Sequence, residues 1–176
     1  TAAFEPKLDY VIAKLPRFPF DKFASATNKL GTQMKATGEI MGIGSNLEEA
    51  LLKGVRSLEI GANHLHLPKF DNMSVDELLE YIKEFRSDNI FAIAELIYHG
   101  VSVEKIHEIT MITPFFLEAF KNIIDMEEQL RVRKDAEILT AAKKMGFGDK
   151  FIARLWGCTE MDVYNMRKEL NLFTVF

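Results

Sequence analysis

From Ser74 onward, helix-capping residues and glycines divide the sequence into short amphipathic stretches. Ser74 with Glu77 forms a capping box, Ser102 precedes another periodic stretch, and Thr113 precedes a proline at the first helical position. The strongly apolar segment NIFAIAELIYHG ends at Gly100, a residue suited to the left-handed conformation that follows a helix. We therefore expect residues 74–176 to form an all-α domain of short helices packed on one another.

The same region contains a near-repeat. Setting Gly100 on Gly146, an offset of 46 residues, also sets Thr113 on Thr159. The hydrophobic positions that coincide are Ile106 with Ile152, Ile109 with Leu155, Leu117 with Val163, and Phe120 with Met166. Each copy predicts a short helix, a tight turn and a capped helix, and such an array buries its apolar faces against its own neighbours.

The first 60 residues have a mixed pattern. Residues 10–15 alternate and predict a strand ended by Pro16. FDKFASATNKL has a helical pattern with Asp21 as its cap, and TGEIMGIG predicts a second strand. Ser45 with Glu48 then forms a capping box that begins a helix.

Between these parts the pattern lapses at GANHLHLPKFDN, and we expect residues 61–73 to be a linker. The predicted fold class is mainly α: a small α+β segment over residues 1–60, followed by an all-α domain over residues 74–176. The chain opens on Thr1 and ends on the apolar sequence NLFTVF. Because natural domain ends are usually polar, we expect it to be a piece of a longer polypeptide.

Composition excludes several classes of protein. With 48% hydrophobic residues in 176, the chain can bury a substantial core. A net charge of −4 argues against a protein that mainly binds nucleic acid. The single cysteine, Cys158, excludes an internal disulfide framework and fits a reducing, cytoplasmic compartment. No apolar run approaches the ~20 residues that span a bilayer, so no membrane partner is expected.

The second copy of the repeat, DKFIARLWGCTEMDVYNMRKEL, also has the pattern of a helix-turn-helix. A recognition helix needs donors for bases and phosphates near its N-terminus. This one has Glu160 and Asp162 there, with Arg167 and Lys168 only at the far end. We therefore expect packing rather than nucleic-acid binding, and a helix-turn-helix nucleic-acid-binding module remains the alternative.

Two histidine groupings suggest a metal site. His64 and His66 share a side of an extended chain, and Glu95 with His99 lie one helical turn apart. Neither pair has the third and fourth ligands that a zinc site needs, so surface or capping roles are expected and no metal site is predicted. Three acidic residues of one predicted helix are expected to form a solvated face: Asp125, Glu127 and Glu128.

The stretch LGTQMKATGEIMGIG places glycines directly ahead of a helix, as in many phosphate-binding loops. It lacks the Walker spacing, and in the dinucleotide pattern Leu47 stands where the third glycine belongs. Gly42 and Gly44 therefore predict only a tight corner with close backbone contacts. No nucleophile with a base and no spaced acid pair occurs elsewhere, so no catalytic or cofactor-binding residue is predicted.

Longer motifs carry a resemblance to a known family. FEPKLDYVIAKLPRF, then TQMKATGEIMGIG and EEALLK, match the patterns F-E-P-x-x-D-Y-x-x-x-K-x-P-R, T-Q-M-K-x-x-G-E-x-M-x-I-G and E-E-A-x-x-K. FAIAELIYHGVSVEKIHEITMITPFFL matches F-x-I-A-E-x-x-x-x-G-x-S-x-E-x-I-x-x-x-T-x-I-x-x-x-F-L. In these motifs the chain resembles the large chain of carbamoyl phosphate synthase over nearly its whole length.

The resemblance implies that residues 1–59 form the C-terminal end of the first ATP-grasp unit, the carboxyphosphate half. Residues 74–176 would be the helical oligomerization domain. The parent enzyme is a cytoplasmic ligase that makes carbamoyl phosphate from bicarbonate, glutamine-derived ammonia and ATP, for pyrimidine and arginine biosynthesis. Its cofactors are ATP, Mg²⁺ or Mn²⁺, and K⁺. The implied partners are the rest of the large chain, the small glutamine amidotransferase subunit and a second copy bound through the helical domain.

The sequence departs from the family at the catalytic core. The metal-binding E-x-N-x-R and the glycine-rich loop over ATP are missing, so this chain is expected to be structural and inactive, with no cofactor of its own. In the family, Q-M-K-x-x-G-E lies in the interior near the passage for carbamate. Met34 and Glu39 are therefore candidate lining residues. A buried Glu39 with a partner such as Lys35 or Arg17 is the structural alternative.

Overall fold

The computed structural model describes residues 8–23 and 25–173. Within them, the antiparallel strands β1 (Val11–Arg17) and β2 (Gly38–Gly44) precede helix α1 (Leu47–Ser57). Seven α-helices follow: α2 (Val75–Tyr81), α3 (Asn89–Tyr98), α4 (Val103–Thr110), α5 (Pro114–Val132), α6 (Ala136–Lys144), α7 (Asp149–Trp156) and α8 (Glu160–Glu169). Short 3₁₀ turns lie at Pro19–Asp21 and Pro68–Phe70. The predicted fold class, mainly α after a small α+β start, is confirmed.

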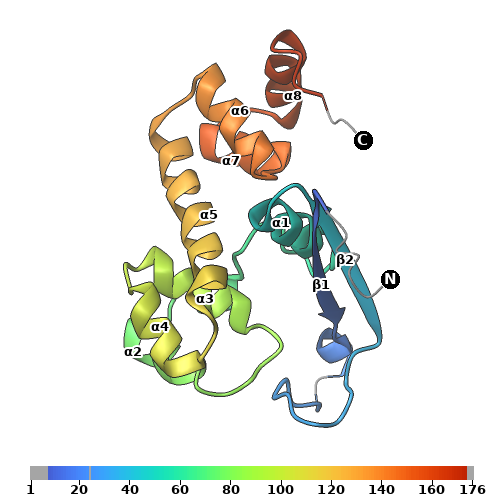
Figure 1. Ribbon diagram of the computed structural model, residues 1–176, viewed down its shortest axis with the longest axis vertical. Helices are drawn as coiled ribbons and strands as arrows, with labels where there is room; N and C mark the ends of the chain where they lie inside the picture. Colours follow the sequence, from blue (N-terminus) through green and yellow to red (C-terminus); the bar gives the residue numbers. More distant parts are fainter. Residues whose placement is uncertain (1–7, 24, 174–176) are drawn as a thin grey trace, which may run out of the picture.

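The long helix α5 joins two helical groups (Figure 1). Helices α2, α3 and α4 lie at one end of it, and α6, α7 and α8 lie at the other. Helix α1 packs on the side of α5, and the β-hairpin covers the outer side of α1. Among the described residues, no helix is both long and apolar enough to cross a bilayer.

The predicted repeat is confirmed and extends by one helix. The offset that sets Gly100 on Gly146 sets α4 on α7 residue for residue, and it sets α3 on α6 to within a residue or two. Gly100 (φ 81°) and Gly146 (φ 89°) both end a helix in the left-handed conformation. At the next turn Met111 (φ 58°) and Gly157 (φ 65°) are also equivalent and left-handed. Each copy is therefore a unit of three helices with the same two turns.

Strand β2 approaches α1 so closely that glycine is required. A Cβ on Gly42 would lie 2.0 Å from Ala50 O and 2.8 Å from Gly54 N, and one on Gly44 would lie 2.7 Å from Ala50 N. Gly54 makes room in turn for Leu15, because a Cβ there would lie 2.1 Å from Leu15 Cδ1. The predicted strand-to-helix corner with close backbone contacts is confirmed.

Two boundary predictions in this part are wrong. Strand β1 continues through Pro16, because β1 is an edge strand of the two-stranded sheet that the described residues form and proline is tolerated there. Helix α1 is capped by Asn46, whose Oδ1 accepts from Glu49 N at 2.8 Å. Glu49, rather than Glu48, reaches back to Ser45 N at 2.7 Å, so the whole cap is shifted by one residue.

The prediction of a helix over FDKFASATNKL is wrong for its described residues, 20–23 and 25–30, which form no helix beyond the turn at Pro19–Asp21. Residues 28–30 instead pair through their backbone with the turn between α2 and α3. Leu30 N donates to Phe85 O at 2.6 Å, and Ser87 N donates to Asn28 O at 3.2 Å. Asn28 Nδ2 also donates to Asp88 Oδ2 at 3.1 Å. These tertiary hydrogen bonds replace the local helical ones.

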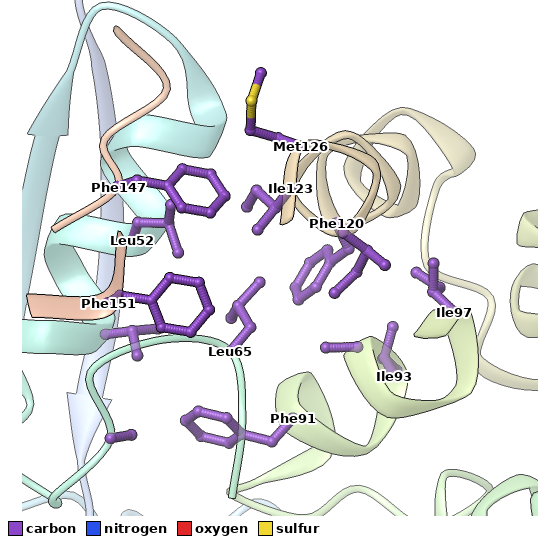
Figure 2. Packing of buried hydrophobic residues seen from close by; sticks show 14 of the residues in the cluster. Leu52, Leu65, Phe91, Ile93, Ile97, Phe120, Ile123, Met126, Phe147 and Phe151 are labelled. Atoms are coloured by element: carbon purple, nitrogen blue, oxygen red, sulfur yellow. The ribbon is translucent and has the colours of Figure 1, made fainter. Parts of the chain in front are cut away.

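The segment predicted as a linker contributes to the core. Ala62, Leu65 and Phe70 are buried in one hydrophobic cluster that also contains Leu15 of the hairpin and residues of α2 to α8. Leu65 lies in the core among side chains of α1, α5 and α7 (Figure 2). Residues 61–73 therefore connect the two parts while packing against both, and the boundary between the two predicted domains stays a prediction.

Candidate functional site

The two buried titratable side chains of the described residues meet where segment 61–67 passes between α5 and α7. His64 is 4% exposed and Glu127 is 7% exposed. His64 Nε2 lies 3.3 Å from Glu127 Oε2 but is not aligned for a hydrogen bond. Arg131, one turn further along α5, donates to Glu127 Oε1 at 2.5 Å. The Glu127 carboxylate therefore has an aligned cationic partner in Arg131. Nε2 of His64 has no hydrogen-bond partner among the described residues.

Aromatic rings enclose the histidine. The rings of His64 and Phe151 stack at 3.8 Å between centroids, with 19° between their planes, and Phe147 lies tilted at 5.0 Å. Phe147 and Phe151 both face the apolar side chains of α1 and α5 (Figure 2). We call His64, Glu127, Arg131, Phe147 and Phe151 the junction cluster, because it joins segment 61–67 to α5 and α7.

The environment of the junction cluster favours a neutral imidazole beside an ionised carboxylate. Burial disfavours the imidazolium and lowers the pKa of His64, against the opposing attraction of Glu127, and the positive charges of Arg154 and Arg56 lower it further. Burial alone would raise the pKa of Glu127, but His64 and Arg131 outweigh it and the pKa is lowered. The cluster therefore holds one negative charge next to one positive charge, with a neutral ring packed against two aromatic rings.

Two surface hollows flank the cluster. The first, of about 490 Å³, is lined by residues 60–64 and 66–68 and by Lys150, Phe151 and Arg154 of α7. The second, of about 570 Å³, shares His66, Phe151 and Arg154 with the first. It also contains the carboxylates of Asp71, Glu95 and Glu127. The titratable side chains of the first hollow are therefore all basic, whereas the second combines three carboxylates with two arginines and two histidines.

Two members of the cluster lie elsewhere than the sequence predicts. The predictions of a surface or capping role for His64 and of a solvated position for Glu127 are wrong, because both side chains are buried. The burial of Glu127 could have been predicted from its spacing along α5. It follows Ile123 by four residues and precedes Leu130 by three, which places it on the buried face of the helix. His64 carried no such signal, since residues 61–67 have no periodic structure.

His66 and His99 are paired with carboxylates at the surface, whereas Nδ1 of His107 lies 2.7 Å from Ile112 O. Glu95 lies 3.3 Å from His99 Nε2 through Oε1 and 3.9 Å from His66 Nδ1 through Oε2, and His66 Nε2 lies 3.4 Å from Asp71. Within residues 8–23 and 25–173, no group of three or more His, Cys, Asp or Glu side chains is arranged to hold a metal ion.

The two candidate lining residues lie on the surface of this chain. Met34 is 82% exposed in the loop before β2. Glu39 projects from the outer face of β2, and its Oε2 lies 2.9 Å from Lys14 Nζ on β1. Lys35 instead donates to Lys29 O at 2.5 Å. Whether Met34 and Glu39 line a passage stays a prediction.

Helices α7 and α8 have the order of a helix-turn-helix, but the side chains of Asp162 and Arg167 are bonded within the chain. Asp162 closes a capping box with Thr159, accepting from Thr159 N at 2.9 Å. Arg167 Nη2 donates to Asp149 Oδ2 at 2.5 Å, which holds this cation against α7. No observation therefore favours the nucleic-acid-binding alternative.

These features define an all-α domain made of two similar three-helix units, preceded by a β-hairpin and helix α1. The chain matches the family model described as carbamoyl-phosphate synthetase large chain, oligomerisation domain, over residues 39–171. The match begins in β2 and spans about three quarters of the sequence. The chain belongs to the family of the carbamoyl-phosphate synthetase large chain, and the resemblance stated from its motifs is confirmed.

Proposed function

We propose that this chain is a non-catalytic assembly module of a glutamine-dependent carbamoyl-phosphate synthetase. The family match carries the proposal, because the matched region is an oligomerisation domain of a large chain. In this proposal the helical residues 74–176 bind a second copy, and residues 1–60 belong to the end of the ATP-grasp carboxyphosphate unit. Residues 61–73 join these two parts.

Exposed apolar side chains support a role in assembly. Tyr10, Ile12, Met41 and Ile43 project from the face of the hairpin opposite α1. At the corner between α4 and α5, Met111, Phe115 and Phe116 are exposed, Phe115 by 68%. Large apolar side chains that gather on a surface are typical of interaction sites. We assign the hairpin face to the rest of the large chain and the helical corner to self-association.

The parent enzyme supplies the chemistry in this proposal. It would use ATP, Mg²⁺ or Mn²⁺, and K⁺ to form carbamoyl phosphate for pyrimidine and arginine biosynthesis in the cytoplasm. The small glutamine amidotransferase subunit would deliver ammonia to it. In the assembled enzyme Met34 and Glu39 would border the carbamate passage, with Glu39 exposed in this chain because the opposing surface belongs to the rest of the large chain.

Sedimentation velocity over a wide range of protein concentration tests the assembly role. We expect a concentration-dependent increase in sedimentation coefficient, weakened when Phe115 and Phe116 are both replaced by Ser. The matched control replaces Phe85, exposed by 73% in the turn between α2 and α3, by Ser. A monomer at every concentration contradicts self-association, and equal weakening by the control contradicts the choice of the helical corner.

Calorimetric titration with Mg-ATP tests the absence of catalysis. We expect no saturable binding that depends on Mg²⁺, because the chain lacks the E-x-N-x-R motif and the glycine-rich loop. Saturable binding that is lost on removal of Mg²⁺ contradicts the non-catalytic assignment.

A further inference from the structure

We propose that the first hollow binds the phosphate group of a small phosphorylated molecule. This site goes beyond the assembly role and does not depend on it. Every titratable side chain that lines the hollow is basic: His64, His66, Lys150 and Arg154. The whole chain carries a net charge of −4, so the charge of this lining is opposite in sign to that of the protein as a whole. A positively charged hollow on a negatively charged protein attracts anions to that one place.

Two cations in the hollow are available to a ligand. Lys150 and Arg154 are exposed and lie one turn apart on α7, so their side chains project from the same face. In the described part of the chain neither is paired with a carboxylate. Elsewhere on α7, by contrast, Asp149 is shared between Lys143 at 2.8 Å and Arg167 at 2.5 Å. The acceptor nearest in sequence is therefore already occupied.

The hollow also orients these donors. Arg154 Cζ lies 5.0 Å from the centroid of the Phe151 ring, which supports the guanidinium against an aromatic surface. The same Phe151 ring stacks on His64, whose side chain is 3% exposed and whose Nε2 has no aligned hydrogen-bond partner. His66 stands at the rim and is turned toward Asp71 and Glu95 in the second hollow. The donors offered to an anion are therefore the guanidinium and the ammonium, with the imidazole behind them.

The lining favours a phosphate over a carboxylate. A phosphate group has three terminal oxygens and nearly two negative charges, which suit a guanidinium fork and a separate ammonium at once. The amide of Asn63, also in the lining, can donate to a further oxygen. Ile60, Leu67 and Pro68 supply apolar surface on the 60–68 side, and about 490 Å³ exceeds the size of a bare ion. The ligand class is thus a phosphate ester with an apolar or ring-bearing body.

Titration with phenyl phosphate, followed by amide chemical shifts and calorimetry, tests the site. We expect saturable shifts at residues 60–67 and 150–154, and weaker binding of inorganic phosphate and of benzoate. Replacing Lys150 or Arg154 by Gln should weaken phenyl phosphate binding roughly tenfold, the effect of losing one charge-assisted hydrogen bond. Both side chains are exposed, so the fold is expected to survive, and far-UV circular dichroism checks this.

Lys168→Gln is the matched control. Lys168 is exposed on α8, outside the lining of the hollow, and the substitution removes the same charge. We expect it to leave binding unchanged. If Lys150→Gln and Lys168→Gln weaken phenyl phosphate binding equally, the net charge of the protein explains the effect, and the proposed site is overturned. Benzoate binding as tight as phenyl phosphate would overturn the ligand class, and the absence of saturable shifts would overturn both.

Discussion

Gly42→Ala is expected to detach the hairpin from α1. The added methyl group would lie 2.0 Å from Ala50 O and 2.8 Å from Gly54 N, and both atoms belong to the helix backbone. Overpacking a core typically costs about 1–3 kcal/mol when side chains can shift, and a helix backbone cannot shift in this way. Separation of β2 from α1 would also expose Leu15, whose burial contributes about 1.5–3 kcal/mol. We therefore expect a loss of about 3 kcal/mol.

Amide hydrogen exchange of β1 and β2 measures this loss where it occurs, and urea unfolding followed by Trp156 fluorescence measures its effect on the helical core. Trp156 is the single tryptophan, and its Nε1 donates to Leu130 O at 2.9 Å, far along the chain from the hairpin. Gly38→Ala is the matched control on the same strand, because a Cβ there meets nothing within 4 Å. Equal exchange rates in the two variants would refute the close-approach argument.

The repeat supplies a second matched pair. Gly146→Ala and Gly100→Ala both place alanine at positive φ, a cost of about 1–2 kcal/mol, but only the former also crowds Glu49 Cα at 2.8 Å. Thermal unfolding should show the larger loss at Gly146, and equal losses would contradict the crowding. Met111→Gly removes a left-handed non-glycine residue (φ 58°) and should stabilise the chain by about 1 kcal/mol in urea; a loss of stability would contradict this. Because the pKa of His64 is lowered on folding, the unfolded state takes up the proton first as pH falls. The free energy of unfolding should therefore fall below about pH 6.5, the usual histidine value, by at most about 1.4 kcal/mol per pH unit. His64→Phe should remove this slope, and an unchanged slope would assign it to other groups.

Much of the helical part was predictable from local rules. The capping box at Ser74, the caps at Ser102 and Thr159, and the glycine stop at Gly100 all lie where the sequence placed them. Each depends on contacts within about four residues, so no tertiary information is needed. The repeat was predictable for the same reason, because its two copies have a capping threonine and a glycine at positions 46 residues apart. The cap of α1 was missed by one residue because Ser45 and Asn46 are both good caps.

The junction cluster and the basic hollow were not predictable in this way. His64 belongs to a segment without periodicity, and its partners lie on α5 and α7, far away in the sequence. The loop that was predicted as a helix differs for the same reason, because Leu30 and Asn28 find backbone partners near Phe85 and Ser87. Local propensity was outweighed there by hydrogen bonds that exist only once α2 and α3 are in place.

The sequence by itself determined the helical class, the positions of most helix ends, the repeat, and the family to which the chain belongs. These are properties of short-range spacing and of long motifs, which a linear chain records directly. Tertiary structure alone decided which polar groups are buried and which cations stay unpaired. Burial and charge pairing depend on segments that are distant in sequence, so His64 became a core residue and Lys150 with Arg154 became a basic surface only when α5, α7 and residues 60–68 came together.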